Sequence, residues 1–235
     1  MHESPLPFTL QNKAGKKVTY KTPDGKTATA YEIKAPKATD NYLFVIHEWW
    51  GLNDYIMQES ERLYREVGNV NVLALDLYDG KVAQNSEEAM KYVKAVDNER
   101  AKAIIQGAIN YVGKDADIAT IGWCFGGGWS LQAGLLAGEQ AEAVVMYYGM
   151  PERNVERLKQ LDAPVLGIFA EQDQSITPEI VRDFEQKMKE AGKEVTIKMY
   201  DAVHAFANPS NPKYDKQAAE DAHKLAVAFI KKHLD

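Results

Sequence analysis

Short apolar runs alternate with longer amphipathic segments along most of the chain. After residue 40 each apolar run has the length of a buried strand, and apolar residues at helical spacing follow most of these runs. The predicted strands span residues 42–46, 70–77, 118–123, 143–148, 164–170 and 195–200. The predicted helices span residues 53–68, 86–112 in two pieces broken near Asp97-Asn98, 126–136, 178–192 and 214–233. This alternation predicts a mostly parallel sheet that is covered by helices on both faces.

The N-terminal part of the chain has a different pattern. Residues 17–20 and 27–33 flank the turn sequence Pro23-Asp24-Gly25, which predicts a β-hairpin at an edge of the sheet. The sequence contains no internal repeat and no linker rich in proline, glycine or serine. We therefore expect a single α/β domain over residues 1–235, in which residues 1–16 form an N-terminal arm.

Composition and charge exclude several classes of function. The chain has 235 residues, 45% of them hydrophobic, and a formal net charge of -6 without a continuous basic stripe, so we expect no nucleic-acid partner. No apolar run approaches the ~20 residues of a membrane-spanning helix. The start of the chain also lacks a signal pattern, so we expect a cytoplasmic protein without membrane contact. Cys124 is the only cysteine, which excludes an intramolecular disulfide and a cysteine-rich zinc site.

The segment Gly122-Trp123-Cys124-Phe125-Gly126 fits the G-x-S-x-G pattern of a nucleophile elbow, with cysteine in place of serine. It lies between a predicted strand and a predicted helix, which is the context that the motif requires. The glycines permit a strained turn that lifts the nucleophile above the sheet, and the Phe125 N–H can then donate to the oxyanion of a tetrahedral intermediate. A free cysteine is usually no more than a small buried hydrophobe, but this glycine frame indicates chemistry.

An elbow of this kind is followed along the chain by an acid and then by a histidine, each on a loop after a later strand. Asp173 and His204 occupy those two places, so we expect His204 to act as the base and Asp173 to orient it. Glu171 and Asp201 remain rival acids. We prefer Asp173 because residues 174–177 supply a loop between it and the next helix.

The loop after the first parallel strand carries further candidates. His47 precedes Cys124 and so breaks the expected order. Glu48 leaves a central strand on the same side of the sheet as the elbow, where its carboxylate can approach Cys124. The Trp49 N–H can supply the second oxyanion donor. A metal site formed by His47, Glu48 and His204 stays open, but their spacing is not typical of metal ligands, and we expect neither a metal nor another cofactor.

On these motifs the chain resembles the dienelactone hydrolase family of bacterial hydrolases over nearly its whole length, from about Thr27 to Leu234. The resemblance implies an α/β-hydrolase fold without a large lid domain. It also implies cysteine-dependent cleavage of a carboxylic ester or lactone through a thioester, with Glu48 helping to generate the thiolate by pairing with the thiol or with a nearby arginine. The segments that carry it are His47-Glu48-Trp49-Trp50-Gly51-Leu52-Asn53, Asp76-Leu77-Tyr78, Gly122-Trp123-Cys124-Phe125-Gly126-Gly127, Gly167-Ile168-Phe169-Ala170-Glu171-Gln172-Asp173 and Val203-His204-Ala205-Phe206.

The substrate does not follow from the resemblance. Members that cleave dienelactones hold the substrate carboxylate with two arginines, which would fall at about Gly80 and at Asn208 in this chain. Lys81 can replace one of them as a point charge but not as a planar bidentate donor. Aromatic residues near the strand ends predict a largely uncharged pocket instead. We expect it to be lined by Trp50, Tyr78, Lys81, Trp123, Tyr147 and Phe206, with Trp49 and Tyr148 also near it and Trp129 in the core.

We therefore expect a hydrolase that acts on a small neutral or aromatic ester or lactone, as a monomer or a small homo-oligomer. The residues do not separate an ester from a lactone. One alternative is true dienelactone hydrolysis, with Lys81 or Arg153 binding the carboxylate. Another is a non-hydrolytic binding or redox-sensing protein in which Cys124 is oxidised, although no second cysteine is present to resolve the oxidised form.

Overall fold

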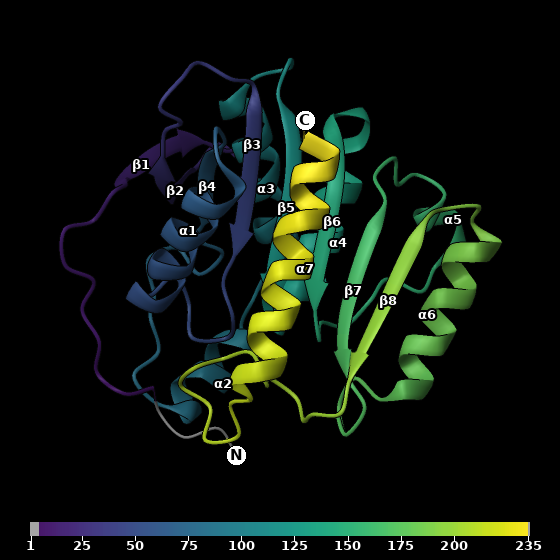
Figure 1. The fold of residues 1–235 in the computed structure, drawn as a ribbon. Coiled ribbons are helices and arrows are strands. Elements are labelled where there is room, and N and C mark those ends of the chain that lie inside the picture. Colours follow the sequence, from purple (N-terminus) through teal and green to yellow (C-terminus); the bar gives the residue numbers. More distant parts are fainter. Residues whose placement is uncertain (1–4, 235) are drawn as a thin grey trace.

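The computed structural model describes residues 5–234, which form one eight-stranded sheet between two layers of helices (Figure 1). The strand order is β1-β2-β4-β3-β5-β6-β7-β8. β2 pairs antiparallel with β1 and with β4, and every other pair is parallel. The strands are β1 Lys16–Lys21, β2 Thr27–Ile33, β3 Asn41–Ile46, β4 Asn71–Leu75, β5 Asp117–Trp123, β6 Ala141–Tyr147, β7 Val165–Ala170 and β8 Val195–Tyr200.

Helices cover both faces of this sheet. Helices α1 and α7 pack on one face, whereas α3, α4 and α6 pack on the other. Figure 1 shows α1 and α7 in front of the sheet, with α3 and α4 behind it. The helices are α1 Asp54–Val67, α2 Ser86–Lys94, α3 Asn98–Val112, α4 Phe125–Ala137, α5 Val155–Leu158, α6 Pro178–Glu190 and α7 Lys216–Leu234, with a 3₁₀ turn, η1, at Gly138–Gln140.

The central strands are apolar on both sides because both sides are covered. In β3, Leu43 and Val45 join the core beneath α1 and α7, whereas Phe44 and Ile46 join the core beneath α3 and α4. All four side chains are fully buried. Successive residues of a strand point to opposite faces, so a continuous apolar run is what a doubly covered parallel strand requires.

The α/β-hydrolase fold expected from the sequence is confirmed. The hairpin forms from β1 and β2, and the long helical segment breaks between α2 and α3, as predicted. The predicted arm is one residue too long, because β1 already begins at Lys16, and its first four residues lie outside the described part of the chain. The single turn of α5 was not predicted, since four residues show no periodicity. No helix among residues 5–234 is long and apolar enough to cross a membrane.

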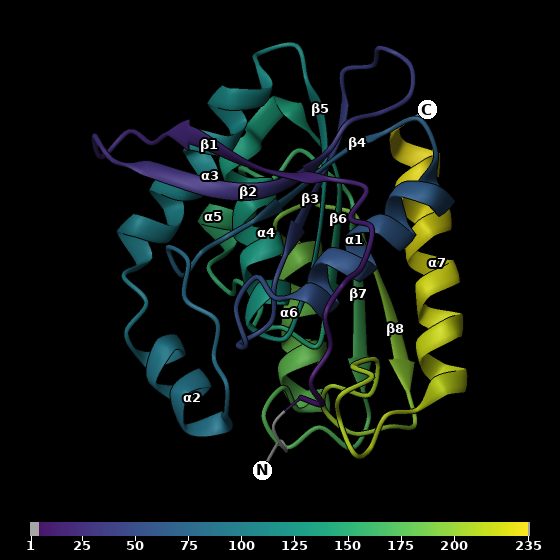
Figure 2. The ribbon, with the colours of Figure 1, turned by 90° about the vertical axis from the view of Figure 1, so that its left-hand side faces the viewer.

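The carboxyl ends of the parallel strands meet along one edge of the sheet, at the bottom of Figure 1. The loops that leave β3, β5, β6, β7 and β8 therefore lie close together there. Figure 2 shows that α2 also lies at this edge, below α3. Ligands of parallel α/β sheets bind at this edge.

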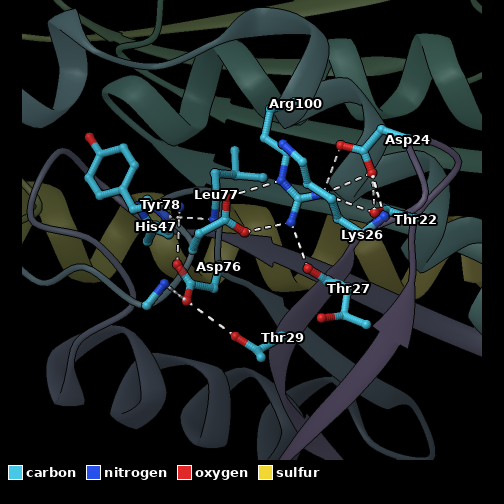
Figure 3. A network of polar contacts seen from close by, with 12 residues as sticks. Thr22, Asp24, Lys26, Thr27, Thr29, His47, Asp76, Leu77, Tyr78 and Arg100 are labelled. Carbon is cyan, nitrogen blue, oxygen red and sulfur yellow. Dashed lines mark hydrogen bonds and ion pairs between the residues drawn. The ribbon is translucent and has the colours of Figure 1, made fainter.

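Arg100, in the first turn of α3, joins three segments that are distant in sequence (Figure 3). Its guanidinium pairs with Asp79 at 2.6 Å and with Asp24 at 3.1 Å, and it donates to the Thr27 carbonyl at 2.6 Å. Its side chain is only 11% exposed. The β1–β2 turn, the loop after β4 and the start of α3 are thereby held together.

We expect Arg100→Met to lower the free energy of unfolding by about 2 kcal/mol, because it removes the ion pairs to Asp24 and Asp79 and the hydrogen bond to the Thr27 carbonyl. Urea unfolding followed by circular dichroism measures the change. Arg182→Met is the matched control, since the Arg182–Glu179 pair is exposed on α6 and should contribute under about 0.5 kcal/mol. Equal losses in the two variants would contradict the proposed role of Arg100.

Candidate active site

Cys124 occupies a tight turn between β5 and α4. Its φ of 53° lies in the left-handed region that non-glycine residues rarely adopt. The turn is possible only because Gly122 and Gly126, two positions before and after Cys124, lack side chains. A Cβ on Gly122 would lie 2.1 Å from the Gly126 carbonyl oxygen, and a Cβ on Gly126 would lie 2.2 Å from that of Ile46. The glycine frame seen in the sequence is thus a requirement of this packing.

The structure brings Cys124, His204 and Asp173 together in a line. His204 Nε2 lies 3.2 Å from Cys124 Sγ, and His204 Nδ1 lies 2.5 Å from Asp173 Oδ2. The Asp173 carboxylate is buried, and its Oδ1 accepts hydrogen bonds from the N–H groups of Ser175 and Ile176 at 2.7 and 3.0 Å. The loop after β7 therefore fixes the acid, and the acid orients the imidazole toward the thiol.

The electrostatics of this line favour a protonated imidazole. Burial alone would lower the pKa of His204, but the hydrogen bonds to Asp173 and Cys124 outweigh burial and raise the pKa to about 10. Burial would likewise raise the pKa of Asp173, and the hydrogen bond and charge of His204 reverse that effect and lower it. An imidazolium formed when His204 takes the thiol proton is thus stabilised where it forms.

The rival acids lie elsewhere. Glu171 and Asp201 are both exposed, and Asp201 accepts a hydrogen bond from the Gln172 side chain at 2.7 Å. Neither has the buried position that Asp173 holds beside the imidazole.

Trp49 and Phe125 follow two neighbouring strands and lie beside the thiol in the wall of one cavity. β3 and β5 are paired, with Ile46 opposite Gly122, so the residues that follow them emerge side by side. Both aromatic residues line the cavity that Cys124 lines. Phe125 is the first residue of α4, and the first N–H groups of a helix have no carbonyl partner within it.

Glu48 is buried in the same loop, and its carboxylate binds Asn208. The Asn208 side-chain amide donates to Glu48 Oε2 at 2.6 Å. Burial raises the pKa of Glu48 to about 7, against the opposing effects of His204 and of the Asn208 hydrogen bond. Asn208 stands where the resemblance places an arginine, so a neutral partner leaves this carboxyl group close to its titration point at neutral pH.

His47 has a structural role. Its Nε2 accepts the Leu77 N–H at 3.1 Å, and so its Nδ1 donates to the Glu48 carbonyl at 2.6 Å. Burial lowers the pKa of His47, which favours this neutral form. Both ring nitrogens are occupied, and residues 5–234 contain no group of three side chains placed to hold a metal ion. His47 in this form is therefore not free to bind a metal ion together with Glu48 and His204.

A cavity of about 900 Å³ opens beside Cys124 and His204. Its walls come from α2, α3, α4 and the loops after β3, β6 and β7, and most of its large side chains are apolar. The contributions of α2 and α5 carry no motif, so sequence reasoning missed them. Beyond Cys124, His204 and the two flanking aromatics, it is lined by Ser86, Glu87, Met90, Val93, Asn98, Lys102, Gly128, Trp129, Gln132, Tyr148, Met150, Arg157, Ser175 and Ile176.

The predicted pocket list requires correction, because none of its six residues lines this cavity. Trp50, Trp123 and Tyr147 instead line a second cavity of about 100 Å³, together with Glu48 and Asn208.

The other three predicted pocket residues lie outside both cavities. Phe206 is fully buried against Tyr148 and Tyr200, Tyr78 packs on His47 and Phe125, and Lys81 is exposed beside Tyr92.

The strand-end aromatics point to either side of the sheet, which the sequence does not reveal. Conversely, Trp129, expected in the core, lines the cavity at Cys124.

Comparisons with known proteins agree with this architecture. The sequence profile of the dienelactone hydrolase family matches residues 28–234. Protein usf of Aquifex pyrophilus is 30% identical over 214 residues, which cover 86% of this chain and 92% of that protein. A protein of Aquifex aeolicus (strain VF5), provisionally named carboxymethylenebutenolidase, is 27% identical with the same coverage. The crystal structure of P91, a dienelactone hydrolase-like promiscuous phosphotriesterase from metagenomic libraries, has a TM-score of 0.79 at 18% identity and covers 94% of this chain and 100% of its own.

The raised pKa of Glu48 leads to a stability prediction. The folded state holds this proton up to about pH 7, whereas the unfolded chain releases it near the ordinary value of 4.5. Folded protein thus binds the proton more tightly, and stability falls as the pH rises between these values, by up to about 3 kcal/mol. Glu48→Gln removes this loss, so its stability relative to the parent should increase from pH 5 to pH 8 in urea unfolding. If the difference in stability between Glu48→Gln and the parent stays constant from pH 5 to pH 8, the raised pKa of Glu48 is contradicted.

Proposed function

The chain belongs to the dienelactone hydrolase family and is a carboxylic ester or lactone hydrolase, and from this premise we propose that it works through a Cys124 nucleophile and a thioester. The observation that carries the proposal is the line of Cys124, His204 and Asp173, at 3.2 and 2.5 Å. These distances are those of a nucleophile in contact with its base and of a base in contact with its orienting acid.

In the proposed reaction the thiol proton of Cys124 has passed to His204, in line with the raised pKa of that imidazole, and the thiolate attacks the carbonyl carbon. The N–H groups of Phe125 and Trp49 stabilise the oxyanion. His204 then returns the proton to the leaving alkoxide, which departs and leaves an acyl thioester on Cys124. Water, activated by the same imidazole, hydrolyses the thioester and regenerates the thiol. A lactone follows the same course, except that its leaving group stays attached to the acyl chain.

We further propose a neutral substrate. The two arginines that hold a carboxylate in the resemblance are replaced by Gly80 and Asn208. Binding an anionic lactone would require Lys81 or Arg153, but neither lines the cavity, and Arg153 pairs with Asp183 at 2.6 Å. An uncharged ester or lactone of a bulky acid or alcohol suits these surroundings better than an anion does.

We expect Cys124→Ala to abolish hydrolysis of p-nitrophenyl acetate, with a fall in kcat of at least about 10⁴-fold, because no nucleophile remains. Release of p-nitrophenol measures it, and mass spectrometry of the parent stopped in mid-reaction should find the acyl group on Cys124. Full activity in Cys124→Ala would exclude the mechanism. If no ester or lactone is turned over but mild peroxide converts Cys124 to a sulfenic acid, the redox-sensing alternative gains support.

We expect Asp173→Asn to lower kcat/KM by about 10³- to 10⁴-fold, because an amide neither fixes the imidazole tautomer nor stabilises its charge. Asp201→Asn is the matched control and should stay within about twofold of the parent, since Asp201 is exposed on the neighbouring loop. The same p-nitrophenyl acetate assay compares both variants. A large loss in Asp201→Asn alone would reverse the assignment of the acid.

A further inference from the structure

We propose that the substrate carries an apolar group on each side of the scissile bond, with a medium-length acyl chain lying along α2 and a bulky leaving group lying between Met150 and Ile176. This proposal rests on the hydrolase function proposed above and adds the class of ester that the site takes. It follows from the size of the cavity, from the placement of two exposed methionines and from the order of the strands.

The cavity is too large for a small lactone. Its volume of about 900 Å³ lies near the upper end of the ~300–1,000 Å³ found for pockets that bury a drug-sized molecule. A small ring would leave most of this apolar wall in contact with water. A longer or bulkier substrate gains affinity from the same wall, because each buried methylene contributes to binding.

Two exposed methionines line the cavity. Met90 on α2 is 44% exposed, and Met150 after β6 is 55% exposed. Five large hydrophobic side chains between residues 5 and 234 are exposed, and two of them line this cavity. Methionine side chains are flexible and adapt to varied apolar partners. Apolar side chains left exposed in the wall of a cavity beside a thiol indicate binding surfaces.

The strand order decides which end takes which part of the substrate. His204 must protonate the leaving group, so that group lies on the side of His204 and of the loop after β7 that carries Ile176. Met150 follows β6, the strand between β5 and β7. The leaving group therefore contacts Met150 and Ile176.

The acyl group then extends away from His204, on the β3 side of β5. Trp49 follows β3, on the opposite side of β5, and packs in one cluster with residues of the α2 region. Met90 and Val93 lie on α2 and line the cavity beyond it. Figure 1 shows α2 and the end of β7 at opposite ends of the catalytic edge. The acyl chain therefore runs past Trp49 onto Met90 and Val93 of α2.

The cations of the cavity are already paired. Lys102 lies 2.7 Å from Glu99, and Arg157 contacts Glu152 at 2.9 Å and Gln132 at 2.6 Å. Each of these two cations thus already has an acidic partner in the protein.

Two substrate ratios test the two ends separately in the full-length enzyme. The acyl ratio compares kcat/KM for p-nitrophenyl octanoate and p-nitrophenyl acetate, and the leaving-group ratio compares 2-naphthyl acetate and phenyl acetate. In the parent we expect both ratios to be at least about one. Met90→Asp should lower the acyl ratio about tenfold and leave the leaving-group ratio within about twofold, and Met150→Asp should do the reverse. Met90→Leu and Met150→Leu are the matched controls, which keep an apolar surface of similar volume and should retain both ratios.

A parent that prefers acetate to octanoate by more than about tenfold would overturn the proposal, as would substitutions that change both ratios alike. These outcomes are distinct from failure of the proposed function. Hydrolysis of p-nitrophenyl acetate that depends on Cys124 but is insensitive to Met90 and Met150 overturns only the substrate class. Loss of that dependence on Cys124 overturns both.

Discussion

The close approach of β3, β5 and α4 at the Cys124 turn is the constraint on which the rest of the site depends. The Ile46 and Gly126 carbonyl oxygens lie where a Cβ on Gly126 or Gly122 would have to be. This contact forces the chain to reverse within one residue and holds Cys124 at a φ of 53°. The same reversal presents the thiol above the sheet and starts a helix directly behind it. Strain in one residue is thus maintained by packing that two glycines permit.

The loops after β7 and β8 complete the arrangement. Asp173 is buried and holds its carboxylate by two backbone N–H groups, so its position owes little to side-chain freedom. His204 lies between this fixed acid and the thiol. Because the acid and the thiol are both set by backbone geometry, the imidazole has little choice of orientation. The pKa shifts of Asp173 and His204 follow from this enforced proximity.

Glu48 lines a different cavity from the thiol. It lines the small cavity with Trp50 and Trp123, whereas the thiol lines the large one. Its partner Asn208 carries no charge, and burial therefore raises the pKa of Glu48 to about 7. An arginine at that place would keep the carboxylate ionised. The neutral amide of Asn208 thus leaves the protonation of this buried acid to burial.

The sequence by itself determined the fold class, the nucleophile turn and the order of acid and base, because each of these depends on local spacing. A glycine on either side of Cys124 and a strand before it suffice to define the turn, and Asp173 and His204 were found by their places after later strands. The lining of the substrate cavity could not be predicted in this way. Trp123 and Tyr147 end their strands next to the site, yet both point beneath α1 and α7. Period-two alternation shows which residues share a face but not which face meets the thiol. Met90 and Met150 become part of the site only because the tertiary fold brings α2 and the loop after β6 to the same edge of the sheet.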